Sequence, residues 1–174
     1  MTQLDALPLA TSAPSRLDVI RRLAQVLANA HFPRGDLAAL RRLDPMLPTG
    51  TAYWRLLHEH VPDAYRRGAD LERRWATILQ GMAIMAPHHH GPDSPGQALA
   101  RVGYSEQRLA RLLNSRGESF RLAVPRLCRY LTSRGGQAVD WTRLGALILA
   151  EGRDRERAEQ LRLDLARDYF AAID

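Results

Sequence analysis

Apolar side chains recur along the chain at steps of three and four residues, which places them on one face of an α-helix. The stripe over residues 71–82 is the clearest in the first half, and residues 120–131 repeat the spacing in the second half. No segment alternates apolar and polar residues over the length of a half-buried strand. The pattern predicts an all-α fold, a two-lobed helical bundle of about eight or nine helices.

Capping and helix-breaking residues set the limits of these helices. Asp36, Ser105 and Asp140 stand where a side-chain oxygen can cap a helix N-terminus. Pro125 falls inside a stripe, where proline kinks a helix or shifts its start. The predicted helices lie within residues 16–30, 36–43, 51–61, 71–86, 97–102, 105–114, 119–131, 140–148 and 161–173.

One loop and one tail organise the chain. Residues 87–96 contain three histidines, three prolines and two glycines, a composition typical of a loop. We expect the boundary between two lobes there, with an N-terminal lobe over residues 16–92 and a C-terminal lobe with a basic face over residues 93–174. Residues 1–15 lack helical spacing and are predicted to form a flexible tail.

Composition limits the protein classes that remain. The chain has 174 residues, of which 45% are apolar and 25% charged, enough to bury a core. No apolar run approaches the ~20 residues of a membrane helix, and residues 1–15 lack the pattern of a secretory signal. The single cysteine, Cys128, excludes an internal disulfide and CxxC metal pairs. We therefore expect a cytoplasmic protein without membrane association.

The basic residues are all arginine. There are 25 of them against 19 acidic residues, which gives a net charge of +6. The absence of lysine excludes a Schiff-base or P-loop lysine, while guanidinium groups suit planar contacts with phosphate. A GC-rich genome also produces such a composition, so the total alone does not identify a site.

The positive charge is concentrated in residues 101–134. This window holds eight arginines but only two acids, Glu106 and Glu118, and its net charge of +6 equals that of the whole chain. Such an excess is typical of a surface that binds a polyanion, although the solvated faces of amphipathic helices give the same count. The spacing places Arg108 and Arg111 on one helix face, opposite the leucines, and the pair at 126 and 129 repeats it.

Other candidate chemistry is weak. His88–His90 are adjacent in a loop with only Asp93 nearby, so they are a poor metal site. His58 and His60 lack HExxH spacing and point apart on a helix. Cys128 and the three tryptophans lie on or beside apolar stripes and are expected in the core. We predict no catalytic residue, no metal and no cofactor.

Residues 97–118 read QALARVGYSEQRLARLLNSRGE, and this run resembles the signature of the CasB family. Three weaker segments agree in order: LAALRR at 37–42, AYWRLL at 52–57 and VDWTRL at 139–144. Gly152 and Arg153 and a terminal helix of mixed charge follow them. The resemblance covers roughly residues 35–170.

CasB proteins are small subunits of Cascade, the type I-E CRISPR surveillance complex. The resemblance implies an all-helical, two-lobed protein without a known catalytic role that serves antiviral defence. It implies as partners the guide RNA, the target DNA, the backbone and large subunits of Cascade, and a second copy of the chain. It also implies that basic faces hold the guide–target duplex and the displaced strand of the R-loop, where base pairing reads sequence and protein reads the backbone.

The resemblance also supplies candidate residues and two departures. Glu151 stands where relatives often carry an aromatic residue, and Pro125 lies in a helix expected to be continuous. The candidate nucleic-acid-binding residues match or adjoin the family motifs: Arg41, Arg42, Arg101, Arg108, Arg111, Arg116, Arg126, Arg129 and Arg153.

Two other functions fit the same residues. Segments 105–114 and 119–131, joined by a glycine turn in a basic window, also fit a helix-turn-helix DNA-binding regulator, which would prefer one duplex sequence. A structural spacer, whose arginines face protein partners, is the other alternative. An enzyme ranks third, because the sequence offers no acid–base pair or nucleophile.

Overall fold

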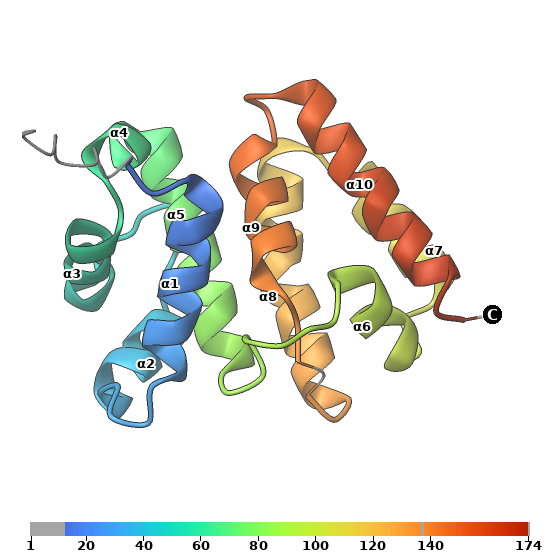
Figure 1. The fold of residues 1–174 in the computed structure, drawn as a ribbon, viewed down its shortest axis with the longest axis horizontal. Helices are drawn as coiled ribbons and strands as arrows, with labels where there is room; N and C mark the ends of the chain where they lie inside the picture. The colour runs from blue at the N-terminus through green and yellow to red at the C-terminus, as the bar shows by residue number, and fades with distance from the viewer. Residues whose placement is uncertain (1–12, 137, 174) are drawn as a thin grey trace, which may run out of the picture.

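The computed structural model describes residues 13–136 and 138–173, which fold into ten α-helices (Figure 1). Apart from an isolated β-bridge between Asp93 and Val139, these residues form no strand, so the all-α prediction is confirmed. The helices are α1 (Arg16–Ala28), α2 (Arg34–Arg41), α3 (Thr51–His60), α4 (Asp63–Arg66), α5 (Ala69–Met85), α6 (Pro95–Arg101), α7 (Glu106–Asn114), α8 (Gly117–Ser133), α9 (Trp141–Ala150) and α10 (Arg155–Phe170).

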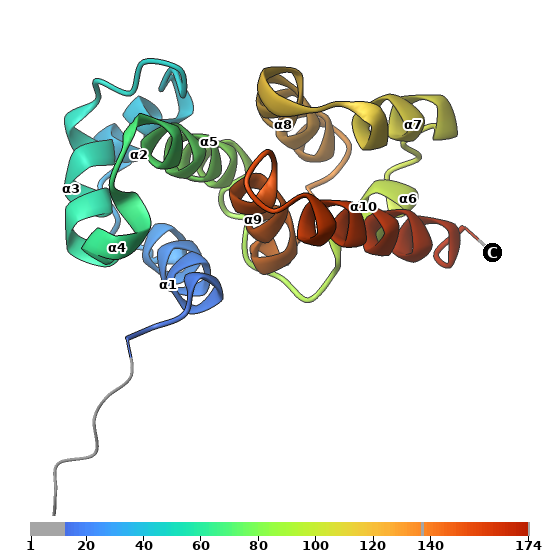
Figure 2. The same ribbon diagram turned by 90° about the horizontal axis from the view of Figure 1, so that it is seen from above.

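The middle of the molecule is built from α5, α8 and α9. The most extensive contacts join α5 to α8 and α6 to α10, and α1 packs against α9. Figures 1 and 2 show α1–α5 on one side and α6–α10 on the other. One cluster of buried side chains runs through both sides, from Ile20 in α1 to Tyr169 in α10. The division into lobes at residues 92 and 93 stays a prediction.

Two of the three predicted caps are present. Ser105 accepts a hydrogen bond from the Arg108 N–H, and Asp140 accepts one from the Thr142 N–H. The prediction for Asp36 was wrong, because α2 begins at Arg34 and Asp36 lies in its first turn. A carboxylate there still favours the helix through the helix dipole.

Pro125 lies in the interior of a helix. One helix, α8, spans Gly117–Ser133 with Pro125 inside it, so the proline does not shift the start of the helix. Proline has no N–H, and the carbonyl of Arg121 therefore lacks its usual donor four residues later. Pro125 itself is buried in the middle of the molecule.

Most of the predicted flexible tail, residues 1–12, lies outside the described residues. The last residue of the predicted tail, Ser15, is ordered as the N-cap of α1. Ser15 and Asp18 form a capping box, in which each side chain binds the other's backbone N–H.

The side chains expected in the core are largely there. Trp75, Trp141 and Cys128 are buried, while Trp54 is partly buried against the core. Burial raises the pKa of Cys128 to about 12. A close approach of α6 to α10 depends on Gly96, because a Cβ there would collide with the backbone of Leu165 and Tyr169. None of the described helices combines the length and apolar character needed to cross a membrane.

Candidate nucleic-acid interface

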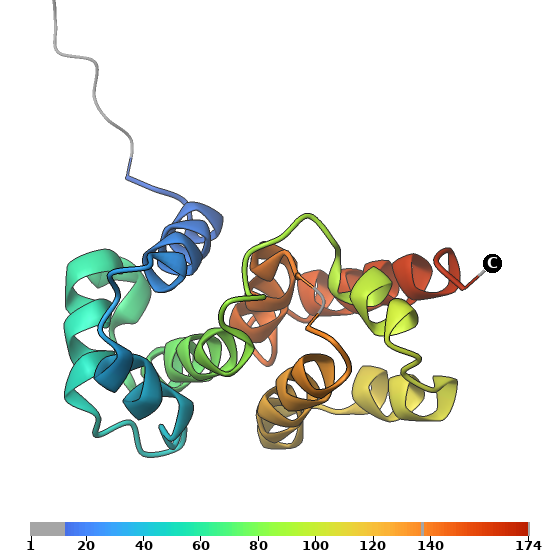
Figure 3. The same ribbon diagram turned by 90° about the horizontal axis from the view of Figure 1, so that it is seen from below.

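A groove of about 430 Å³ lies between α7 and α8. Figures 2 and 3 show these helices together on one side of the molecule, with α6 and α10 opposite. The walls of the groove carry the exposed side chains of Arg108, Arg111, Arg126 and Arg134. Leucine, alanine, tyrosine and serine side chains form the rest of the lining. The groove therefore combines strong positive charge with an apolar floor.

Tyr130 organises the arginines of this groove. The guanidinium carbons of Arg108 and Arg134 lie 5.1 Å and 5.5 Å from the centre of its ring, within the range of a cation–π contact. The Tyr104 ring meets the same ring edge to face at 5.1 Å. The Tyr130 hydroxyl donates to the carbonyl of Gly103 at 3.2 Å, which fixes the ring in turn.

A second, smaller groove of about 270 Å³ adjoins the first. It lies between α8 and the segment that follows α2, and it is lined by Arg42, Arg121, Arg126 and Arg129, together with Asp44. Arg126 lines both grooves, so the positive surface continues from α7 across α8. We define the basic track as its six exposed arginines that make no salt bridge within the described residues: Arg42, Arg108, Arg111, Arg126, Arg129 and Arg134.

The other four predicted arginines are also exposed, but each makes a polar contact with another part of the protein. Arg41 donates from Nε to the carbonyl of Ala83 at 2.7 Å, where it helps to cap α5. The other three form ion pairs with carboxylates: Arg101 with Asp93, Arg116 with Glu159 at 3.0 Å, and Arg153 with Asp70 at 3.7 Å.

Asp70 lies where α5, α8 and the end of α9 meet. Its carboxylate pairs with Arg74 at 2.8 Å, Arg121 at 3.4 Å and Arg153 at 3.7 Å. The hydrogen bond from Arg74, together with the charges of all three arginines, holds the pKa of Asp70 below its usual range. Arg74 is buried and also donates to the carbonyl of Ile148 at 2.7 Å. This one carboxylate therefore compensates part of the charge of three arginines, one of which, Arg121, lines the second groove.

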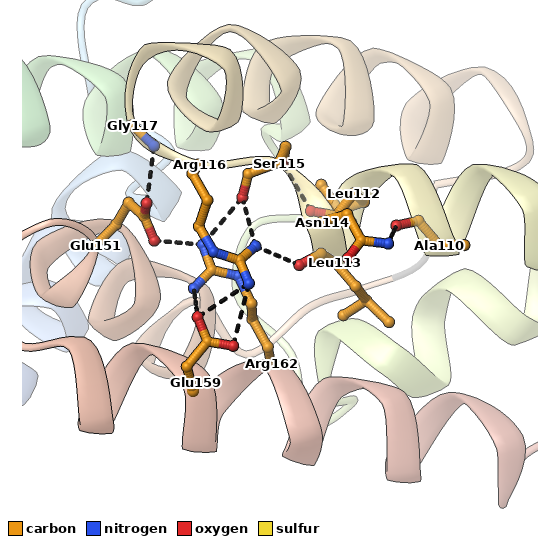
Figure 4. A network of polar contacts seen from close by, with 10 residues as sticks. All are labelled: Ala110, Leu112, Leu113, Asn114, Ser115, Arg116, Gly117, Glu151, Glu159 and Arg162. Atoms are coloured by element: carbon orange, nitrogen blue, oxygen red, sulfur yellow. Dashed lines mark hydrogen bonds and ion pairs between the residues drawn. The ribbon is translucent and has the colours of Figure 1, made fainter.

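A buried ion pair fixes the connection between α7 and α8 (Figure 4). Glu151 accepts a hydrogen bond from the Gly117 N–H at 2.7 Å and pairs with Arg162. Arg162 also donates to the carbonyl of Ser115 at 3.1 Å and contacts Glu159 at 3.2 Å. Gly117 has a φ of +53°, a conformation that favours glycine. Glu151, where the resemblance predicts an aromatic side chain, thus carries a charge that the fold satisfies.

The pKa of Glu151 reflects this environment. Burial raises it, but the Gly117 N–H and the Arg162 guanidinium together outweigh burial, so the pKa lies below its usual range. Glu151 is ionised at neutral pH, and both partners are only 4% exposed. The connection between α7 and α8 is therefore held by a charge-assisted link.

Two residues of the groove were missed as candidates, Tyr130 and Arg134. The sequence did contain a signal, because Arg126, Tyr130 and Arg134 follow one another at four-residue steps and share a helix face.

The histidines of the loop after α5 lie in different environments. His89 is buried against the carbonyl of Ala24 at 2.9 Å, whereas His90 is exposed. No group of three or more potential metal ligands occurs among the described residues.

Comparison with known proteins gives one family. Residues 36–170 match the family described as CRISPR-associated protein Cse2. No curated protein and no solved structure matches the chain. The match covers well over half of the sequence and includes both grooves and the buried ion pair.

Proposed function

The chain belongs to the Cse2 family, the small subunits of type I-E Cascade also called CasB, and we propose that its basic track binds the nucleic-acid backbone in that complex. The family is a structural subunit of Cascade, in agreement with the resemblance of residues 97–118. The track would hold the guide–target duplex or the displaced strand and so stabilise the R-loop during antiviral defence. We also propose the cytoplasm as its location, and the other Cascade subunits and a second copy of the chain as its neighbours.

The observation that carries this proposal is the unneutralised charge along the two grooves. Six exposed arginines gather around α8 without an acidic partner in residues 13–136 and 138–173, although the chain has 19 acidic residues. Exposed like charges in one place weaken a fold unless a counter-charge binds. R-loop formation exchanges one duplex for another at nearly balanced free energy, so a few backbone contacts are enough to tip it.

The test compares two double variants of equal charge. Arg108→Ala/Arg111→Ala removes two arginines of the basic track, whereas Arg22→Ala/Arg155→Ala removes two exposed arginines from α1 and α10. Binding of single-stranded DNA falls with salt by a log–log slope of about −0.7 per phosphate contact. The first variant should therefore flatten the slope by about 1.4 and shorten the R-loop lifetime of reconstituted Cascade.

Two outcomes would contradict the proposal. Unchanged salt slope and R-loop lifetime in Arg108→Ala/Arg111→Ala would remove the track from nucleic-acid binding. Failure of that variant to assemble, with normal binding by the free chain, would favour the structural spacer. Family membership leaves the helix-turn-helix regulator without support of its own, and a selection on random duplexes should enrich no motif.

A further inference from the structure

The groove between α7 and α8 contains more than a phosphate-binding surface needs. Positive charge alone is enough to bind the phosphate backbone of a nucleic acid. This groove also has two tyrosine rings and an apolar floor that includes Leu112 and Leu127. We propose that it holds one unstacked base of a single-stranded nucleic acid, with the adjacent phosphates on Arg111 and Arg126. This inference rests on the proposed function and names the ligand that the groove takes.

The stacked arginines are the first argument. Arg108 and Arg134 both lie against the Tyr130 ring, at 5.1 Å and 5.5 Å, so one aromatic side chain orders two flat cations. Guanidinium planes and aromatic rings are the surfaces on which proteins stack unpaired bases. Neither arginine has an acidic partner in the described part of the chain, so both guanidinium groups are available to a ligand.

The size of the groove is the second argument. Its volume of about 430 Å³ lies within the range of about 300–1,000 Å³ that small-molecule sites occupy. A base in a duplex is stacked between its neighbours and cannot enter such a groove unless it is flipped out. The groove should therefore favour a single strand over a duplex. Every base has a π face, so little sequence preference is expected.

The first experiment compares two ligands on the unaltered protein, and variants of the protein follow. The full chain is titrated with a short single-stranded DNA and with an oligonucleotide of equal length and charge whose sugars are all abasic. Loss of one stacked base should weaken binding about 5- to 100-fold. A 2-aminopurine placed within the intact strand should change fluorescence on binding, because its stacking changes.

Two tyrosine variants then locate the effect. Tyr130→Leu removes the ring, and it should lower affinity for the intact strand to that of the abasic strand while leaving the latter unchanged. Tyr130→Phe keeps the ring and loses only the hydroxyl that donates to Gly103, so it should bind like the parent.

The outcomes separate this inference from the proposed function. Equal affinity for intact and abasic strands, with weaker binding of both by Arg108→Ala/Arg111→Ala, would overturn the base site and leave backbone binding intact. Absence of binding to either strand would overturn both. A Tyr130→Leu variant that weakens both strands equally would also contradict the base site.

Discussion

The buried ion pair of Glu151 and Arg162 should contribute strongly to the stability of the fold, and this contribution can be measured. Removing one partner of a buried ion pair costs about 3–5 kcal/mol, because the other charge remains without compensation. Glu151→Gln keeps an acceptor for the Gly117 N–H, and Arg162 keeps Glu159 at 3.2 Å, so about 3 kcal/mol is expected. Arg162→Met leaves the Glu151 carboxylate with only the Gly117 N–H, and about 4 kcal/mol is expected.

The assay is chemical and thermal unfolding of four proteins at pH 7. A loss of 3 kcal/mol lowers the melting temperature of a chain of this size by about 6–12 °C. The double variant Glu151→Gln/Arg162→Met contains neither charge, so it should be no less stable than the worse single variant. If the loss of unfolding free energy in the double variant equals the sum of the losses in the two single variants, Glu151 and Arg162 do not interact, and the ion pair is refuted.

Acid pH provides an independent check on the same pair. The folded pKa of Glu151 lies below its value of 4.5 in the unfolded chain. Its contribution is therefore fully present above pH 4.5 and is lost as the pH falls through the folded pKa. The stability gap between the parent and Glu151→Gln should narrow below pH 4.5. A gap that stays constant to the acid limit would mean that the carboxylate charge contributes nothing.

Three further predictions concern the scaffold. Ser15→Ala should destabilise the protein by about 1 kcal/mol in urea unfolding, because the capping box of α1 is lost, whereas Ser15→Thr keeps the hydroxyl and should retain most of the stability. Gly96→Ala should cost about 1–3 kcal/mol, because the new methyl group meets the backbone of α10; unchanged stability would mean that α6 and α10 lie farther apart. Cys128 should resist a thiol reagent at pH 8 until the protein is unfolded, since it is buried and its pKa is raised to about 12; rapid reaction of the native protein would contradict its burial.

Local sequence signals predicted most of the helices. The three- and four-residue spacing and the caps at Ser105 and Asp140 depend only on neighbouring residues. Helix α4 escaped notice because its four residues are too few for a hydrophobic period. Asp36 was misplaced because a side chain that can cap a helix also suits its first turn.

The candidate site was predictable only in part. The window of residues 101–134 contains five of the six arginines of the basic track. The neutralising partners could not be anticipated, because they come from distant segments. Arg116 meets Glu159 and Arg41 meets the carbonyl of Ala83, over 43 and 42 residues of sequence. Only the packing of the helices decides which arginines stay free.

Asp70 affects how much nucleic acid the basic track would cover if it binds as proposed. Its carboxylate pairs with Arg121, which lines the second groove, and with Arg153. If the basic track binds nucleic acid as proposed, this one acid would limit how far the bound strand extends past the second groove, because it competes with phosphate for Arg121 and Arg153. A change at position 70 would free both arginines for phosphate, but it would also leave the buried Arg74 without its carboxylate, so the length of the proposed track and the stability of the fold depend on the same residue.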